Sequence, residues 1–225
     1  MIDWNHIDTV LLDMDGTLLD LYFDNHFWLE HLPTHYAKIN NLSLETAKTQ
    51  LYELFKAHQG TLNWYCLDFW SEELDFDVAD LKRDVAHLIS PRPNAITFLH
   101  NVRESGRRAI LVTNAHRKSL ELKLEHTDIE NHLDCLISSH DFGLPKEDML
   151  FWDVLAREVP YDERRTLLID DSLAVLRSAK LAGIGHTLAI LKPDSKKPDI
   201  DTQEFVSLDC FSSIMPPPLT RNNYA

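Results

Sequence analysis

Short apolar runs that end in polar turn residues recur along the chain. Residues 7–12 form the first such run, and Asp13, Met14, Asp15, Gly16 and Thr17 follow it directly. This pattern is typical of a buried strand that leads into a functional loop. Comparable runs lie at residues 109–112, 135–138, 166–169 and 186–191. We therefore predict a strand at each of these places, with 186–191 as the last core strand.

Segments of helical periodicity separate these strands. The helices are predicted at residues 95–104, 118–126, 147–158 and 173–182. Gly106 and Gly183 follow two of them at the position of a C-terminal cap. Strands that alternate with helices indicate a parallel sheet with helices on both faces. The predicted fold class is therefore α/β, with a Rossmann-like three-layer α/β/α core.

Residues 20–93 interrupt this alternation and contain no convincing strand. Ser43 precedes a segment with apolar residues at helical spacing, as an N-cap residue would. Further helical stretches are predicted at 64–74 and 78–89. We predict a helical cap at 20–93, inserted into a discontinuous core made of 1–19 and 94–225. The polar tail beyond Pro193, with prolines at 216–218, is expected to pack loosely.

Charge and composition mainly exclude classes of partner. The chain of 225 residues has a net charge of −14, which argues against a nucleic-acid polymer as partner. A local pocket with a metal ion can still bind a small phosphate ester. No apolar run approaches the ~18 residues of a membrane span, and no signal peptide is visible. The three cysteines are expected to be reduced, so we expect a cytoplasmic protein. The oligomeric state stays open.

Four polar clusters follow predicted strands or lie in a loop that returns to the same edge of the sheet. In an open parallel sheet, ligands bind beyond the carboxyl ends of the strands. The sequence therefore places these clusters in one crevice. The residues are Asp13 and Asp15, Thr113 and Asn114, Lys146, and Asp170 and Asp171.

The residue types in this crevice indicate phosphoryl chemistry. Several carboxylates repel one another and require a cation, and hard oxygen ligands favour Mg²⁺. Lys146 would neutralise an anionic substrate, while Thr113 and Asn114 would donate hydrogen bonds to phosphate oxygens. Asp13 can attack phosphorus, and Asp15 can transfer protons. No pair of the 12 histidines has a convincing companion carboxylate on one helix face, so no histidine-built metal site is predicted.

These motifs resemble those of the haloacid-dehalogenase-like hydrolase superfamily. Residues 13–18 (Asp-Met-Asp-Gly-Thr-Leu) are similar to its first motif, Thr113-Asn114 to its second, Lys146 to its third, and residues 169–172 to its fourth. The order and spacing match over residues 7–191. The inserted helical segment resembles the cap of this superfamily, which closes over the substrate.

The resemblance implies a role for each matched residue. Asp13 would be the nucleophile and a metal ligand, and Asp15 the general acid/base, with its main-chain carbonyl on Mg²⁺. Asp171 would be a carboxylate ligand, assisted by Asp170. Thr113, the Asn114 backbone and Lys146 would hold the phosphoryl group. Asp15 disfavours a dehalogenase, because those enzymes usually lack this aspartate.

A narrower similarity covers parts of both the core and the cap. Five stretches resemble bacterial GMP/IMP 5′-nucleotidases: 11–21, 61–68, 113–116, 123–127 and 145–148. This resemblance implies hydrolysis of purine nucleoside 5′-monophosphates to nucleoside and phosphate. A sugar-phosphate phosphatase or phosphomutase remains the alternative.

The cap would have to recognise the base, since the core clusters are committed to phosphate. GMP and IMP share an N1–H donor and an O6 acceptor. Asp68 is a candidate acceptor for N1–H, and Asn25 or Asn63 could donate to O6. Trp64 or Tyr65 could stack on the purine.

Overall fold

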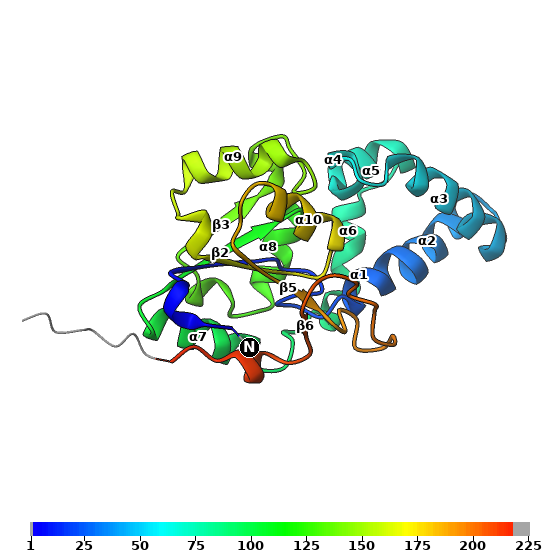
Figure 1. Ribbon diagram of the computed structural model, residues 1–225. Coiled ribbons are helices and arrows are strands. Elements are labelled where there is room, and N and C mark those ends of the chain that lie inside the picture. The colour runs from blue at the N-terminus through cyan, green and yellow to red at the C-terminus, as the bar shows by residue number, and fades with distance from the viewer. Residues whose placement is uncertain (1, 218–225) are drawn as a thin grey trace, which may run out of the picture.

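Six parallel strands form one sheet at the centre of the structure, a computed structural model that describes residues 2–217 (Figure 1). Their order across the sheet is β3-β2-β1-β4-β5-β6. The strands are β1 (Thr9–Leu12), β2 (Arg108–Thr113), β3 (Cys135–Ser138), β4 (Thr166–Asp170), β5 (His186–Ile190) and β6 (Ser207–Leu208). The predicted α/β class is confirmed, and the five predicted strands are present with shifts of one or two residues at some ends.

Successive residues of β1 face opposite sides of the sheet, and helices cover both sides. Val10 and Leu12 join a buried cluster that includes α7 (Ala95–Glu104), whereas Leu11 joins another. That second cluster contains residues of α9 (Met149–Glu158) and α10 (Leu173–Leu181). Because both faces are buried, the strands are nearly continuous apolar runs, as expected for a parallel sheet.

The regular elements between β1 and α7 are all helical and pack beside the sheet (Figure 1). They are α1 (Tyr22–His26), a π-helical turn (Phe27–His31), α2 (Leu32–Ile39), α3 (Leu44–His58), α4 (Leu62–Tyr65), α5 (Leu67–Leu74), α6 (Val78–Arg83) and a 3₁₀ turn (Ala86–Leu88). These helices bury an apolar cluster of their own around Phe27, Leu51 and Trp70. The exact boundaries of cap and core stay a prediction.

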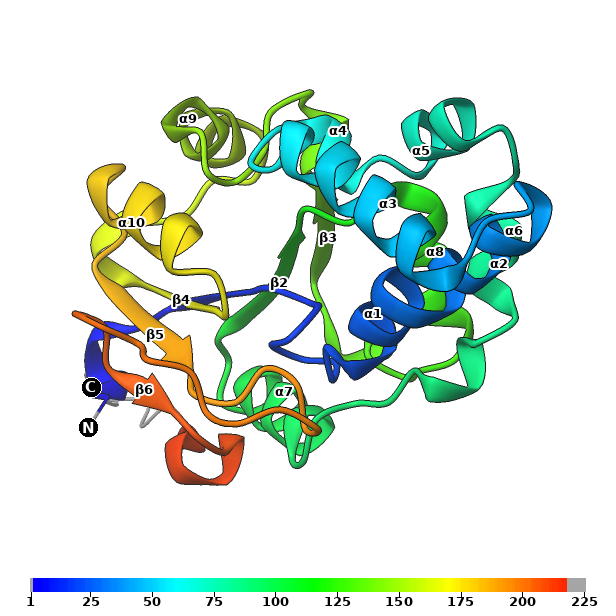
Figure 2. The ribbon, with the colours of Figure 1, turned by 90° about the vertical axis from the view of Figure 1, so that its right-hand side faces the viewer.

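Helix α8 (Arg117–Glu125) connects this cap to the core. Leu120 packs in the core cluster, whereas Leu122 packs in the cap cluster. Helix α6 contacts α8, and the two lie close together in Figure 2. The cap therefore rests on a core helix that begins close to the end of β2.

Two of the predicted cap helices are interrupted. Ser43 caps α3 as predicted, because its Oγ accepts a hydrogen bond from Thr46 N at 3.1 Å. The helix predicted at 64–74 divides at Cys66, whose backbone is extended and whose Sγ accepts from Phe69 N at 3.5 Å. The helix predicted at 78–89 ends at Arg83 and is followed by a 3₁₀ turn.

The prediction of a loosely packed tail is wrong for much of the described part. Strand β6 pairs with β5, so residues 186–191 are not the last strand. Phe205, Leu208 and Phe211 are buried and fill both apolar clusters of the core. Pro218 lies outside the described residues. Within residues 2–217, no helix has the length and apolar character needed to cross a membrane.

Candidate active site

Three carboxylates meet at the carboxyl ends of β1 and β4. Asp13 follows β1, Asp170 ends β4, and Asp171 comes next. Carboxylate oxygens of the three residues lie within 4.8 Å of one another. Burial raises the pKa of Asp13 to about 6, and burial together with Asp13 and Asp170 raises the pKa of Asp171 well above its ordinary value. This cluster is therefore electrostatically favourable only with a cation beside it.

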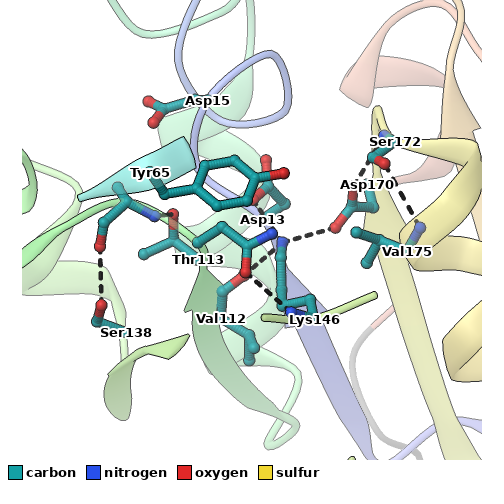
Figure 3. Close-up of polar contacts among 12 residues, drawn as sticks. Asp13, Asp15, Tyr65, Val112, Thr113, Ser138, Lys146, Asp170, Ser172 and Val175 are labelled. Carbon is teal, nitrogen blue, oxygen red and sulfur yellow. Dashed lines mark hydrogen bonds and ion pairs between the residues drawn. The ribbon is translucent and has the colours of Figure 1, made fainter. Parts of the chain in front are cut away.

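Lys146 supplies one such positive charge (Figure 3). Its Nζ donates to Asp13 Oδ1 at 2.6 Å, to Asp170 Oδ2 at 2.8 Å and to the Val112 carbonyl at 2.9 Å. Burial alone would lower the pKa of Lys146, but the two carboxylates outweigh it and raise that pKa. Lys146 is therefore a fixed, buried cation next to Asp13.

The loop that carries Lys146 is held by the residue that follows β2. Asn114 Oδ1 accepts from Lys146 N at 2.9 Å, and Asn114 Nδ2 donates to Glu147 Oε2 at 2.9 Å. Thr113 Oγ1 accepts from Ala115 N at 3.0 Å and is buried. Asn114 thus holds the turn that carries Lys146, whereas Thr113 stabilises the turn that follows β2.

Glu147 links this turn to the cap. Its Oε1 accepts a hydrogen bond from Tyr65 Oη at 2.7 Å, while its other oxygen binds Asn114. The sequence prediction did not assign Glu147 to the site. The sequence signal that could have identified Glu147 is its position directly after Lys146.

Asp15 begins a chain of partly and fully buried charges that runs from the core into the cap. Lys123 Nζ lies 2.6 Å from Asp15 Oδ1 and 2.8 Å from Asp24 Oδ2. Lys82 Nζ lies 2.6 Å from the other oxygen of Asp24. Burial and the nearby Asp24 raise the pKa of Asp15 to about 6, although Lys123 opposes this shift. The sequence prediction missed Lys82, Asp24 and Lys123, because their contacts join segments far apart in the chain.

Gly16 is required by the backbone of the loop after β1. Its φ of +85° is in the region that favours glycine. A Cβ at this position would also overlap the carboxylate of Asp171. The glycine of the first motif therefore lets Asp171 approach the loop that carries Asp13 and Asp15.

A cavity of about 390 Å³ lies between these core residues and the cap. Asp13, Asp15, Asn114 and Lys146 line its core side. The cap contributes mainly large apolar side chains, namely Leu21, Trp28, Leu29, Phe55, Trp64, Tyr65, Leu67 and Trp70. The arrangement suits a ligand with a charged group at one end and an apolar ring at the other.

The residues predicted to recognise the base do not all lie on this cavity. Asn25, Trp64 and Tyr65 line it, and Asn25 Nδ2 donates to Asp194 Oδ2 at 2.6 Å. Asn63 and Asp68 are exposed and are not part of its lining. Asp68 Oδ1 is bound instead by Lys118 Nζ at 2.6 Å.

The carboxylate cluster has the composition of a site for a hard divalent cation. Among the described residues, Asp13 Oδ2 is buried without a hydrogen-bond partner. Both oxygens of Asp170 accept hydrogen bonds, from Lys146 Nζ and from Ser172 N at 2.8 Å. Asp13 Oδ2 and the Asp171 carboxylate are therefore better placed than Asp170 to accept a metal ion.

Known proteins share both the sequence motifs and the fold. The family described as haloacid dehalogenase-like hydrolase matches residues 7–183. GMP/IMP nucleotidase YrfG of Escherichia coli is 42% identical over 215 residues, which cover 96% of this chain and 97% of that protein. Pyrimidine 5′-nucleotidase YjjG of the same species is 26% identical over 53% of this chain and 54% of its own length.

Solved structures agree at the level of the fold. A crystal structure of a HAD phosphatase from Thermococcus onnurineus has a TM-score of 0.76 and 18% identity, with 92% of this chain and 95% of that chain covered. The family match extends from the first predicted strand to the end of α10 and includes Asp13, Lys146 and Asp171. The chain therefore belongs to the haloacid dehalogenase-like hydrolases.

Proposed function

We propose that the protein is a Mg²⁺-dependent phosphomonoesterase that hydrolyses purine nucleoside 5′-monophosphates such as GMP and IMP to nucleoside and phosphate. The observation that carries this proposal is Asp13, which lies at the charged end of a cavity whose cap side is lined mainly by large apolar side chains, several of them aromatic. The 42% identity to a protein named GMP/IMP nucleotidase supports the substrate class, since it extends over the cap as well as the core.

In the proposed reaction, Asp13 attacks the phosphorus atom of the nucleotide. The new bond joins an Asp13 carboxylate oxygen to phosphorus, and the bond from phosphorus to the 5′ oxygen breaks. Asp15 gives its proton to the departing 5′ oxygen and then takes a proton from the water that hydrolyses the aspartyl-phosphate. A pKa of about 6 for Asp15 suits this alternation, because both protonation states are accessible near neutral pH.

The side chains of Asp13 and Asp171 and the main-chain carbonyl of Asp15 would hold Mg²⁺, with Asp170 assisting. The bound ion would supply charge stabilisation for the transferring phosphoryl group. Lys146 adds a second positive charge on the same side, while the Thr113 hydroxyl and the Asn114 backbone donate to phosphate oxygens. The cap excludes water from this region.

Base recognition is assigned to the cap side of the cavity. Trp64 and Tyr65 provide aromatic faces there, and Asn25 provides an amide. Asn63 and Asp68 would need a different cap position to reach the base. A sugar phosphate would leave most of the apolar wall without a matching surface, which makes a sugar-phosphate phosphatase or phosphomutase the weaker alternative.

A phosphate-release assay over a panel of substrates tests the proposal. The panel contains GMP, IMP, AMP, CMP and hexose phosphates, each with Mg²⁺ and with excess chelator. We expect kcat/KM for GMP and IMP to exceed that for AMP by about tenfold, because AMP would leave a buried polar group unpaired. Preference for a hexose phosphate would contradict the substrate class, and full activity in chelator would contradict the role of the metal.

A further inference from the structure

Two histidines and a cysteine come together where the cap contacts the core. Cys66 lies between α4 and α5 of the cap, His116 directly precedes α8, and His140 lies in a 3₁₀ turn after β3. One potential ligand atom from each residue lies within 4.8 Å of the others. The rings of His116 and His140 are perpendicular, with centroids 4.9 Å apart.

Each imidazole has a buried nitrogen that no protein group satisfies. Among residues 2–217, neither His116 Nδ1 nor His140 Nε2 has a hydrogen-bond partner. Burial and the adjacent His116 lower the pKa of His140 to about 4, and burial lowers the pKa of His116. Both rings are therefore neutral near pH 7, which is the form that ligates metal ions.

The three side chains differ in chemistry from the carboxylates of the catalytic centre. Sulfur and imidazole nitrogen are ligands that Zn²⁺ prefers, whereas Mg²⁺ prefers oxygen. All three residues are partly exposed, although the unpaired nitrogens of the two histidines are buried. Asp68 Oδ2 lies 3.7 Å from His116 Nε2 and adds negative charge beside the cluster.

We propose that Cys66, His116 and His140 form a second metal site, which binds Zn²⁺ with water in the fourth position. Binding displaces the thiol proton of Cys66 into solvent, so that the cysteine ligates as a thiolate. The sequence prediction found no histidine-built metal site, because these ligands come from three separate segments and not from one helix face.

The position of the site gives it a consequence for the cap. Cys66 belongs to the cap, whereas His116 and His140 belong to the core, and His116 also lines the catalytic cavity. A bound Zn²⁺ therefore ties the two together beside the phosphate-binding Asn114. Cap opening becomes slower, and so do substrate entry and product release. This consequence rests on the proposed function, whereas the metal site itself does not.

Cobalt titration of the full-length protein in excess Mg²⁺ tests the site. Co²⁺ replaces Zn²⁺ in such sites, and a cysteine ligand gives a thiolate-to-cobalt charge-transfer absorption. We expect this absorption in the wild type and its loss in Cys66→Ser. Serine is a good helix N-cap, so this variant keeps the hydrogen bond to Phe69 N. Cys135→Ser and Cys210→Ser are matched controls, because both are also free, half-buried cysteines outside the cluster.

A second variant and a direct measurement of Zn²⁺ binding distinguish loss of a ligand from misfolding of Cys66→Ser. His140→Gln should weaken Zn²⁺ binding by about tenfold or more, measured by calorimetry, while its thermal unfolding stays cooperative. Cobalt absorption that is absent from the wild type, or unchanged in Cys66→Ser, would overturn the site.

The link to the cap is tested by turnover. With saturating Mg²⁺, added Zn²⁺ should slow phosphate release from GMP in the wild type and have no such effect on Cys66→Ser. Equal inhibition of both proteins would overturn the link and would place the inhibitory ion at the carboxylates instead. If GMP is not a substrate at all, the cobalt titration still decides whether the metal site exists.

Discussion

In the core, the candidate catalytic groups lie at the ends of strands and bind one another directly. Asp13 and Asp170 share Lys146, and all three are buried. In the cap, by contrast, the cavity wall consists mainly of large apolar side chains, many of them aromatic, with Asp24, Asn25 and Lys82 as its polar residues. In the proposed function, the sheet would hold the reacting groups, and packing between the cap helices would form the surface that meets the rest of the substrate.

Several polar contacts cross the boundary between these regions, and two sets of them involve Asp15 or the turn that carries Lys146. One runs from Asp15 through Lys123 and Asp24 to Lys82. The other is the hydrogen bond from Tyr65 of the cap to Glu147 of the core. These contacts join the cap to Asp15 and to the turn that carries Lys146.

The largest effect is expected from Asp13→Asn, which removes the proposed nucleophile from the core. An amide cannot form the aspartyl-phosphate, so kcat should fall at least roughly a thousandfold in the phosphate-release assay. Asp8→Asn at the opposite end of β1 is the control, because Asp8 pairs with Arg165 on the surface. Residual Asp13→Asn activity within about tenfold of wild type would be incompatible with the mechanism.

Asp24→Asn should weaken the connection between cap and core. Burial would raise the pKa of Asp24, but Lys123 and Lys82 outweigh it and lower that pKa from 3.8 to about 2. The carboxylate therefore contributes stability above about pH 4, and this contribution is lost as the pH falls toward 2. We expect the variant to lose about 2 kcal/mol of unfolding free energy at pH 7.

Urea unfolding at several pH values checks this expectation. The difference in unfolding free energy between wild type and Asp24→Asn should shrink as the pH falls from about 4 to 2. A difference that does not change with pH would show that Asp24 stabilises the protein by packing and not by its charge.

Trp64→Ala should affect substrate binding by the cap more than the chemical step. Loss of one stacking surface costs about 1–3 kcal/mol in comparable contacts, so KM for GMP should rise about tenfold. kcat should change less. Tyr52→Ala is a matched control, because Tyr52 is an exposed aromatic residue of α3. An unchanged KM in Trp64→Ala would exclude stacking by this residue.

The smallest effect is expected from Asp68→Ala. Its carboxylate is exposed and bound by Lys118, and a surface ion pair contributes little. The ratio of kcat/KM for GMP to that for AMP should therefore change less than about twofold. Collapse of this ratio would instead support the role in reading N1–H that the sequence suggested, and would require a different cap position during catalysis.

Much of the core was predictable because short stretches of the sequence determine its strands and the residues at their ends. An apolar run followed by Asp13 or Asp170 predicts both a strand and the side chain at its end, and the parallel sheet brings those ends together. The position of Lys146 at the carboxyl edge of the sheet was also predictable, because a short loop after β3 can return there. Gly16 illustrates the limit, since its close approach to Asp171 depends on a contact that the local sequence does not encode.

The cap was less predictable because its contacts join helices that are distant in the chain. Helical periodicity indicates a helical stretch near residues 64–74 but does not say that Trp64 faces the cavity while Asp68 faces Lys118. The break at Cys66 turns α5 relative to α4, and a periodic pattern over 64–74 does not reveal it. In the tail, the apolar residues of β6 and its flanks were too few to predict a strand.

Chemical trapping of the phospho-enzyme tests the central claim most directly. Wild-type protein is quenched during turnover of GMP with Mg²⁺ and treated with borohydride, which reduces an aspartyl-phosphate to homoserine. Mass spectrometry of the peptides should then show homoserine at position 13, dependent on GMP and absent from Asp13→Asn. Homoserine at another aspartate, together with GMP turnover by Asp13→Asn, would contradict the account.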